Sequence, residues 1–273
     1  MTSFTAMKQT LKSALHSTFP GLVPIAKDMH GILRAGLAKL GGSGRPSFTC
    51  AICNYSGPFL DHESKVYPIL HTQCPRCGLY ERHRLQFLVL KELAKRHDFS
   101  KLSILHFAPE MHFERFFNKW FARHQTADIA APSVDFRVDI RELPFADGSY
   151  DVIFASHVLE HVDKDHKALQ EIHRVLSPKG IAILPVPVVS PKTIEYPESN
   201  PYEFGHVRAV GVDYFKRYET VFAKVEVFSS SDFDARNQLY TYEDRSIFPT
   251  EKSPLRLPMP GEKHADYVPV CFK

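Results

Sequence analysis

Between residues 102 and 188, short apolar runs alternate with amphipathic helical patterns, and this alternation limits the fold more than any other feature of the chain. The runs LSILHF, QTADI, SYDVIFASHVL and GIAILPVPV have the composition of strands. EMHFERFFNKWFARH and DHKALQEIHRVL carry apolar residues at helical spacing. Strands that alternate with helices form a parallel sheet with right-handed crossovers. The sequence therefore predicts a Rossmann-like, doubly wound α/β domain.

The flanking segments suggest further elements and a division into three parts. An apolar stripe predicts an amphipathic helix over 22–40 that packs on the main domain, and GGSGRPS follows as a hinge. A second helix is expected over 82–96, a third over 212–222, a strand over 223–230, a polar loop region over 232–262 and a last strand over 265–273. Pro269 argues against a central place for that last strand, because proline has no N–H. We assign 1–47 to a helical arm and linker, 48–97 to a cysteine module with its connecting helix, and 98–273 to the main domain.

Four cysteines give the most specific chemical signal. CAIC and CPRCG are two C-x2-C pairs, Cys50 with Cys53 and Cys74 with Cys77. Each pair can turn two thiolates toward one ion, so two pairs form a closed tetrahedral S4 site of the structural kind. Zinc is favoured, while iron stays open because four thiolates alone do not choose the metal. The fifth, Cys271, has no partner spacing and is expected to be a buried strand residue.

Charge and hydropathy limit which partners and which cellular location we expect. The first hundred residues hold 13 Lys and Arg against 6 Asp and Glu, within a formal net charge of +3. This excess is too mild to demand a nucleic acid. No apolar run approaches the roughly 20 residues of a membrane-spanning helix. We expect a soluble, cytoplasmic protein, with residues 1–27 forming a helical arm rather than a transit peptide.

Polar residues follow the predicted strands where an α/β sheet binds its ligand. The carboxyl ends of the strands carry the segment from His106 to Glu110, then Asp128, then Asp139 with Ile140, and then SHVLEH, which begins at Ser156. Ligands bind in open α/β sheets beyond these ends, near the point where the strand order reverses. Asp128 stands where nucleotide-binding units have an acid for the ribose. A nicotinamide cofactor is disfavoured because the chain has no G-x-G-x-x-G.

Several motifs resemble one enzyme family. DIRELPFADGSYDVIFASHVLEHVDKDHKALQEIHRVLSPKGIAIL resembles the type 11 group of class I S-adenosylmethionine-dependent methyltransferases. CPRCGLYERHRL, ILHFAPE and TIEYPESNPYEFGHVRAVGVDYFKRY look like a bacterial subgroup with an N-terminal four-cysteine zinc knuckle. The resemblance implies a seven-stranded sheet whose last strand is antiparallel and lies between neighbours. It also implies S-adenosylmethionine as cofactor.

The resemblance also implies roles for single residues. Asp128 would bind the ribose hydroxyls, and Asp139 with Ile140 would hold the adenine. The residues His106, Ala108 and Glu110 would flank the methionine moiety, and Ser156 with His157 would close the site below the sulfonium. The family usually has an acid in place of His106 and glycines in place of Ala108 and Glu110. We expect the small Ala108 to suffice at the turn and Glu110 to face the cofactor's ammonium group.

For catalysis, we expect His157 to act as a base or to position the substrate, since imidazole titrates near neutral pH. The subgroup resemblance places His206 and Arg208 near the substrate, where Arg208 would clamp an anionic group. The leading hypothesis is methyl transfer to a small-molecule or saccharide-like acceptor, at oxygen. The alternative is a catalytically silent protein that binds nucleic acid or a protein partner through its zinc knuckle and basic N-terminal part. A nucleic acid is the less favoured partner.

Overall fold

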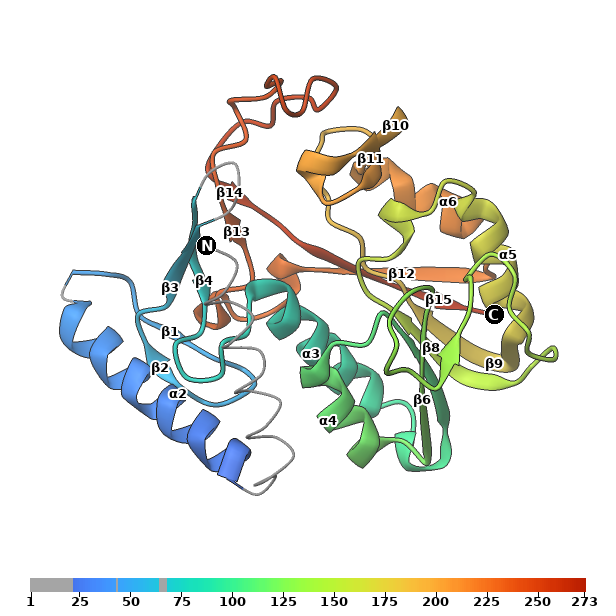
Figure 1. The fold of residues 1–273 in the computed structure, drawn as a ribbon, viewed down its shortest axis with the longest axis horizontal. Helices are drawn as coiled ribbons and strands as arrows, with labels where there is room; N and C mark the ends of the chain where they lie inside the picture. The colour runs from blue at the N-terminus through green and yellow to red at the C-terminus, as the bar shows by residue number, and fades with distance from the viewer. Residues whose placement is uncertain (1–21, 43, 64–67) are drawn as a thin grey trace, which may run out of the picture.

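The computed structural model describes residues 22–42, 44–63 and 68–273, so the expectations for residues 1–21 lie outside it. Its centre is a seven-stranded sheet in the order β12-β15-β9-β8-β5-β6-β7 (Figure 1). The strands are β5 (Ser103–Phe107), β6 (Arg123–Asp128), β7 (Phe136–Arg137), β8 (Tyr150–Ala155), β9 (Leu176–Ile183), β12 (Lys224–Ser229) and β15 (Tyr267–Phe272). In this sheet β15 runs antiparallel to the other six strands. The predicted doubly wound fold is confirmed.

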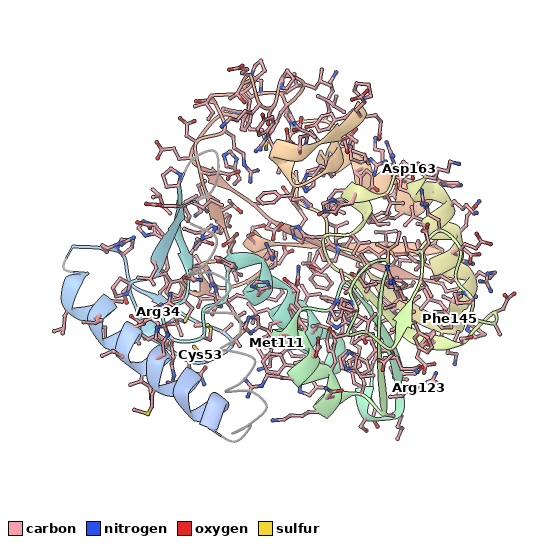
Figure 2. All side chains as sticks on the ribbon, viewed as in Figure 1. Arg34, Cys53, Met111, Arg123, Phe145 and Asp163 are labelled. Atoms are coloured by element: carbon pink, nitrogen blue, oxygen red, sulfur yellow. The ribbon has the colours of Figure 1, made fainter. Side chains whose placement is uncertain are left out.

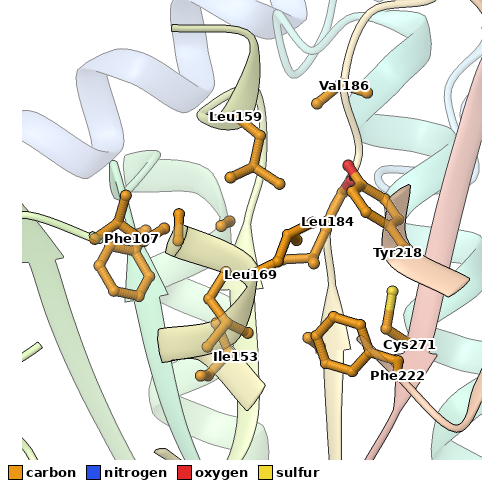
Figure 3. Close-up of a cluster of buried hydrophobic side chains, with 14 of the residues drawn as sticks. Phe107, Ile153, Leu159, Leu169, Leu184, Val186, Tyr218, Phe222 and Cys271 are labelled. Atoms are coloured by element: carbon orange, nitrogen blue, oxygen red, sulfur yellow. Dashed lines mark hydrogen bonds between the residues drawn. The ribbon is translucent and has the colours of Figure 1, made fainter. Parts of the chain in front are cut away.

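Helices cover both faces of this sheet. Helices α3 (Glu81–Ala94) and α4 (Met111–Trp120) pack on one face, where Phe113, Phe117 and Phe154 share a core. Helix α5 (Asp165–Val175) packs on the other face. Figure 3 shows part of that second core, in which Leu169 of α5 lies near Ile153 of β8. Apolar residues on both sides of each central strand explain the continuous apolar runs of the sequence.

Strand β15 holds a central place despite its proline. The carbonyl of Pro269 accepts a hydrogen bond from Leu184 N at 3.1 Å, just beyond the last residue of β9. The N–H and C=O of one residue point to the same side of a strand, so the missing donor also faces the end of β9. The ladder loses little, since β9 leaves the sheet there. The expectation that Pro269 argues against a central strand was wrong for this reason.

The cysteine module is joined to the chain's C-terminal part. Helix α2 (Leu22–Gly41) lies along the module (Figure 1). The module contains β1 (Phe48–Thr49), β2 (Ser56–Gly57), β3 (Leu60–Glu63) and β4 (Pro68–Gln73). Strand β4 pairs with β13 (Thr241–Tyr242), which pairs with β14 (Lys263–His264). The loop region expected over 232–262 therefore supplies a strand to the module's sheet, and the boundary at residue 97 does not separate two independent sheets.

Helix α2 confirms the predicted helix, but the part of its apolar stripe in residues 29–41, whose side chains the structure describes, does not pack on the main domain. The buried positions in this part are small residues, Gly31 and Ala35. Its large apolar side chains are exposed: Met29 66%, Ile32 60%, Leu33 62%, Leu37 59% and Leu40 84%. A side chain at position 31 would overlap the carbonyl oxygen of Arg76. The close approach selects the small face, which hydrophobic periodicity alone does not reveal.

The segment before β12 folds differently from expectation. It forms a hairpin of β10 (Ile194–Asn200) and β11 (His206–Ala209), which the sequence did not predict. The expected helix over 212–222 is a 3-10 turn, Val212–Phe215, followed by the short α6, Lys216–Glu219. Within the described residues, no helix has the length and apolarity needed to cross a bilayer.

Candidate functional site

The four cysteines meet as the spacing predicts. The Sγ atoms of Cys50 and Cys77 lie 3.6 Å apart, as do those of Cys53 and Cys74. Sulfurs at about 2.3 Å from a tetrahedral zinc ion stand roughly 3.8 Å from one another, so the cluster has the size of a ZnS4 site. None of the four forms a disulfide. We call these four residues the cysteine cluster.

Two matching turns hold the cysteine cluster. Asn54 N donates to Cys50 O at 2.9 Å, and Gly78 N donates to Cys74 O at 2.8 Å. Both donors have a left-handed backbone, with φ of 58° at Asn54 and 77° at Gly78. Glycine and asparagine tolerate that conformation best. The two C-x2-C segments therefore form the same turn, and each presents two thiols on one side.

A cavity of about 360 Å³ lies at the carboxyl ends of the central strands. We call it the strand-end cavity. It adjoins β5 and β8, where the strand order reverses. Asp163, which lines it, lies at the opposite end of the sheet from Arg123, the first residue of β6 (Figure 2). Four of the expected cofactor residues line this cavity: Ala108, Asp128, Asp139 and Ile140.

The two aspartates of this cavity are held differently. Asp128 Oδ1 accepts hydrogen bonds from Ala130 N at 2.7 Å and Ala131 N at 2.8 Å. No described residue donates to its Oδ2. Asp139 is paired with Arg141, whose side chain also reaches Asp163 at 2.5 Å. The hydrogen bond from Arg141 is the main reason that the pKa of Asp139 lies below its ordinary value. Both aspartates therefore present acceptors at the cavity, and Asp139 is already shared with a cation.

Three expected cofactor residues do not line the strand-end cavity. His106 is fully buried between Phe117 and Phe154. Burial lowers its pKa to about 3, so the imidazole is neutral, and neither ring nitrogen has a hydrogen bond to another described residue. Glu110 accepts from Arg82 at 3.0 Å and pairs with His83 at 2.9 Å.

The third, Ser156, accepts from Gln86 at 2.9 Å. His106 therefore packs in the core, and Glu110 and Ser156 hydrogen-bond to residues of α3. None of the three side chains points into the strand-end cavity.

Two residues at this edge have a backbone that disfavours a side chain. Ala108 has φ 46° and His157 has φ 54°. Each is fixed by its own N–H, which donates at 2.9 Å to Ala127 O and Pro185 O, respectively. Left-handed residues other than glycine store strain and cluster at functional sites. Ala108 therefore makes, at a conformational cost, a turn that glycine would make more easily.

A second cavity of about 250 Å³ opens on the other side of His157, which lines both. Its wall mixes charged and apolar residues, which come from the start of α3, the segment after β9, the β10–β11 hairpin and the segment before β15. Arg256 Nη2 and Ser253 Oγ are buried there without a hydrogen-bond partner among the described residues, and Nη2 lies 3.5 Å from Glu243 Oε1. Arg245 is paired with Glu243 and donates to Val188 O at 2.7 Å. This second cavity suits a ligand with several polar groups.

Three side chains gather where the two cavities meet. Glu160, His161 and His206 each offer a ligand atom, and these atoms lie within 4.8 Å of one another. We call them the Glu-His cluster. Burial alone would raise the pKa of Glu160, but His157 and His206 outweigh it and hold that pKa below its usual value. Burial lowers the pKa of His206 to about 4. The carboxylate of Glu160 is fully buried, and the 3-10 turn Leu159–His161 has no side-chain cap hydrogen bond.

The side chain of Arg208 does not reach either cavity, so it cannot contact a methyl acceptor there. It is 1% exposed and lines neither cavity. Its guanidinium donates to Leu159 O at 2.6 Å and Val162 O at 2.8 Å, and to Glu195 at 3.0 Å. The first two bonds tie β11 to the 3-10 turn Leu159–His161. Arg208 therefore holds β11, which carries His206, next to the turn that carries Glu160. Because its guanidinium is buried, it is not placed to bind an anionic group of the substrate, as the sequence had led us to expect.

Sequence reasoning missed several lining residues. Ile129, Val138 and Val158 add apolar walls to the strand-end cavity, and Arg141 adds a cation. Ile129 directly follows Asp128, and an apolar residue after a strand-end acid could have been noticed in the sequence. In the structure its side chain is 62% exposed. The second cavity's Arg245 and Arg256 lie in the segment 232–262, which offered no pattern. Only the fold carries that segment back to the sheet edge.

The comparisons with known proteins agree with this architecture. A family model described as a methyltransferase domain matches residues 92–184. A human thiol S-methyltransferase, TMT1B, is 40% identical over 73 residues, which are 27% of this chain and 29% of that protein. An uncharacterized 37.1 kDa protein in transposon TN4556 of Streptomyces fradiae is 39% identical over 77 residues, 28% of this chain and 22% of that one. The chain thus spans less than a third of the length of these curated relatives.

Solved structures with a similar fold have low sequence identity. An S-adenosylmethionine-dependent methyltransferase from Mesorhizobium loti is 17% identical, with a TM-score of 0.45, covering 69% of this chain and 98% of its own. A putative methyltransferase from Bacillus halodurans is 15% identical, with a TM-score of 0.40, covering 67% and 96%.

Proposed function

We propose that this protein transfers the methyl group of S-adenosylmethionine to an oxygen of a small-molecule or saccharide-like acceptor, since residues 92–184 match the model of a methyltransferase domain. The observation that carries the proposal is the pair of cavities that share His157. One has strand-end acids that would suit a nucleoside, and the other has charged side chains that would suit an acceptor. A catalytically silent binding protein is not favoured by the family match.

The strand-end cavity fits the cofactor by its donor set. Asp128 would accept hydrogen bonds from the ribose hydroxyls, and Asp139 would accept one from the adenine amino group. Ile140 and Ile129 offer apolar contact for the ring. Ala108 lets the backbone turn beside the methionine moiety. A cavity of about 360 Å³ is in the range of small-molecule sites.

The acceptor would enter the second cavity. S-adenosylmethionine, when bound, supplies an activated methyl group, so the protein needs to align a nucleophile and exclude water. His157 would hold the acceptor's hydroxyl group and accept its proton. Arg256, which is buried and has one nitrogen without a hydrogen bond among the described residues, would bind another polar group of the acceptor. Arg208 has no direct part in this proposal.

The cysteine cluster would hold a structural Zn²⁺. Its four thiol groups fill a tetrahedral shell, which leaves no position for a substrate. The cluster also packs against the apolar residues Tyr55 and Phe59, so the ion would replace the core that so small a module lacks. Iron in the same four-thiolate shell remains the alternative.

Calorimetry with S-adenosylhomocysteine tests the cofactor site. We expect Asp128→Asn to weaken binding about tenfold or more, because a hydrogen bond to a charged group is lost. Asp98→Asn is the matched control, since Asp98 precedes β5 at the far end of the sheet and is exposed. If the parent protein binds neither S-adenosylmethionine nor S-adenosylhomocysteine, the proposal fails.

Transfer of a labelled methyl group to a panel of acceptors tests the oxygen assignment. The panel holds hydroxylated small molecules, saccharides and thiols. We expect labelled methyl ethers from hydroxyl acceptors and a strong loss with His157→Gln. Labelling of thiols alone would overturn the acceptor atom while leaving the enzyme class intact.

A further inference from the structure

We propose that Glu160, His161 and His206 form a second metal site, which binds one first-row divalent cation where the two cavities meet. The cation would hold an oxygen atom of the acceptor, and this role rests on the proposed function, whereas the binding itself does not. The site is distinct from the cysteine cluster in donor set and in place.

The spacing of the donor atoms is close to that of a metal site. They lie within 4.8 Å of one another, and the rings of His161 and His206 meet edge to face with centroids 4.8 Å apart. Nitrogen and carboxylate oxygen ligands that lie about 2.0–2.2 Å from a tetrahedral ion stand roughly 3.4 Å from one another. A movement of up to about 1.4 Å would therefore bring all three donors onto one ion. His206 is half-buried and His161 is exposed, so both rings can make that movement.

The carboxylate of Glu160 is an independent observation that points to a ligand. The side chain is 0% exposed, and neither oxygen has a hydrogen-bond partner in the described part of the chain. His157 Nδ1 lies 3.3 Å from Oε1, without the alignment of a hydrogen bond. Buried charges in proteins are paired, hydrogen-bonded or bound to metals. An ion at this position would bind the two oxygens, which have the nearby His157 but no hydrogen bond among the described residues.

The position of the cluster gives the ion a function. His161 lines the strand-end cavity and His206 lines the second cavity, so an ion between them faces both. Three protein ligands leave coordination positions open, as in catalytic rather than structural sites. Two imidazoles and a carboxylate suit manganese, iron, cobalt or zinc. An acceptor with an oxygen donor, such as a hydroxyl beside a carbonyl or a second hydroxyl, would occupy the open positions.

Manganese binding to the zinc-loaded protein tests the site directly. Mn²⁺ competes poorly for thiolates, so the cysteine cluster keeps its zinc during the titration. Electron paramagnetic resonance of free Mn²⁺ then measures binding without any turnover. We expect one Mn²⁺ per chain, and a loss of affinity of at least about tenfold in both Glu160→Gln and His206→Gln. His166→Gln, an exposed histidine of α5, should bind as the parent does.

The outcomes separate this site from the proposed function. Thermal melting of the same samples shows whether each variant is folded, and binding of S-adenosylhomocysteine tests the proposed function separately. If Glu160→Gln does not fold, His206→Gln alone decides, because its side chain lies at the cavity wall. Unchanged Mn²⁺ affinity in a folded variant, or no stoichiometric binding by the parent, overturns the site. Mn²⁺ binding without binding of the nucleoside would retain the site and reject the methyltransferase.

Discussion

The cysteine cluster and the Glu-His cluster differ in how the chain assembles them. The cysteine cluster comes from two local turns with the same hydrogen bonds, and its four donors complete a shell. The Glu-His cluster joins a 3-10 turn after β8 to a hairpin that follows β9, and its three donors leave a shell open. A local motif thus builds a closed site suited to stability. A site built from distant elements is open, and its geometry depends on an anchor, Arg208.

The largest effect is expected at the closed site. Cys50→Ser should abolish zinc binding and unfold the module, because structural zinc supplies about 10–16 kcal/mol of binding free energy in small domains. Metal analysis and thermal melting measure both losses. Cys271→Ala is the control, since Cys271 is buried in β15, away from the cluster, and should leave the zinc content intact. Full zinc content in Cys50→Ser would remove the contrast between the two clusters.

The anchor of the open site should show the next largest effect. Arg208→Lys is expected to lower the free energy of unfolding by about 3 kcal/mol or more, because a lysine cannot replace the several hydrogen bonds of a buried guanidinium. Mn²⁺ affinity should fall as well. Arg217→Lys is the matched control: Arg217 shares Asp165 and Glu195 with Arg208 but is 33% exposed, so we expect a loss below about 1 kcal/mol. Equal losses of unfolding free energy in Arg208→Lys and Arg217→Lys would show that the burial of Arg208 does not increase its contribution to stability.

A third test separates a packing histidine from those of the open site. His106 has a pKa of about 3 in the folded protein and an ordinary value near 6.5 when unfolded. Its stabilising contribution is present above pH 6.5 and is lost as the pH falls, since the unfolded chain takes up the proton first. Between pH 7.5 and pH 5, the parent should lose about 2 kcal/mol at this residue.

Urea unfolding at the two pH values measures that loss. His106→Leu should lose about 2 kcal/mol less than the parent, and His166→Gln should behave as the parent. The same acid sensitivity in His106→Leu would assign the loss to other groups, such as His124 beside it.

The smallest effect is expected on the exposed face of α2. Leu37→Ser should change the free energy of unfolding by no more than about 0.5 kcal/mol, because Leu37 is 59% exposed. Gly31→Ala on the opposite face should cost about 1–3 kcal/mol, since the added methyl group meets the Arg76 carbonyl. Chemical unfolding of the two variants measures the difference. A larger loss for Leu37→Ser than for Gly31→Ala would reverse the assignment of the faces.

Much of the fold was readable because each signal was local. The strands around Ile104 and Val152, the helix around Leu169 and both C-x2-C turns depend on residues close in sequence, and the structure has them all. The family resemblance supplied the antiparallel last strand, which Pro269 had argued against.

The strand-end acids Asp128 and Asp139 were also readable, since the carboxyl ends of parallel strands must meet at one edge. The direction of a side chain was harder to predict from the sequence. The backbone of His106 and that of Arg208 lie near the cavities, but both side chains are buried in the protein interior.

The amino-acid sequence by itself determined the α/β core, the four-thiol cluster and the edge of the sheet at which the strand-end cavity lies, because periodicity and short spacings encode them. Tertiary structure alone decided that the segment 232–262 returns to pair with β4 and to wall the second cavity. It also brought His206 to Glu160, and it turned the small face of α2 inward. These depend on contacts between residues far apart in the chain, and the free energy of such contacts is set by close packing and by buried groups such as Arg208, which no local pattern records.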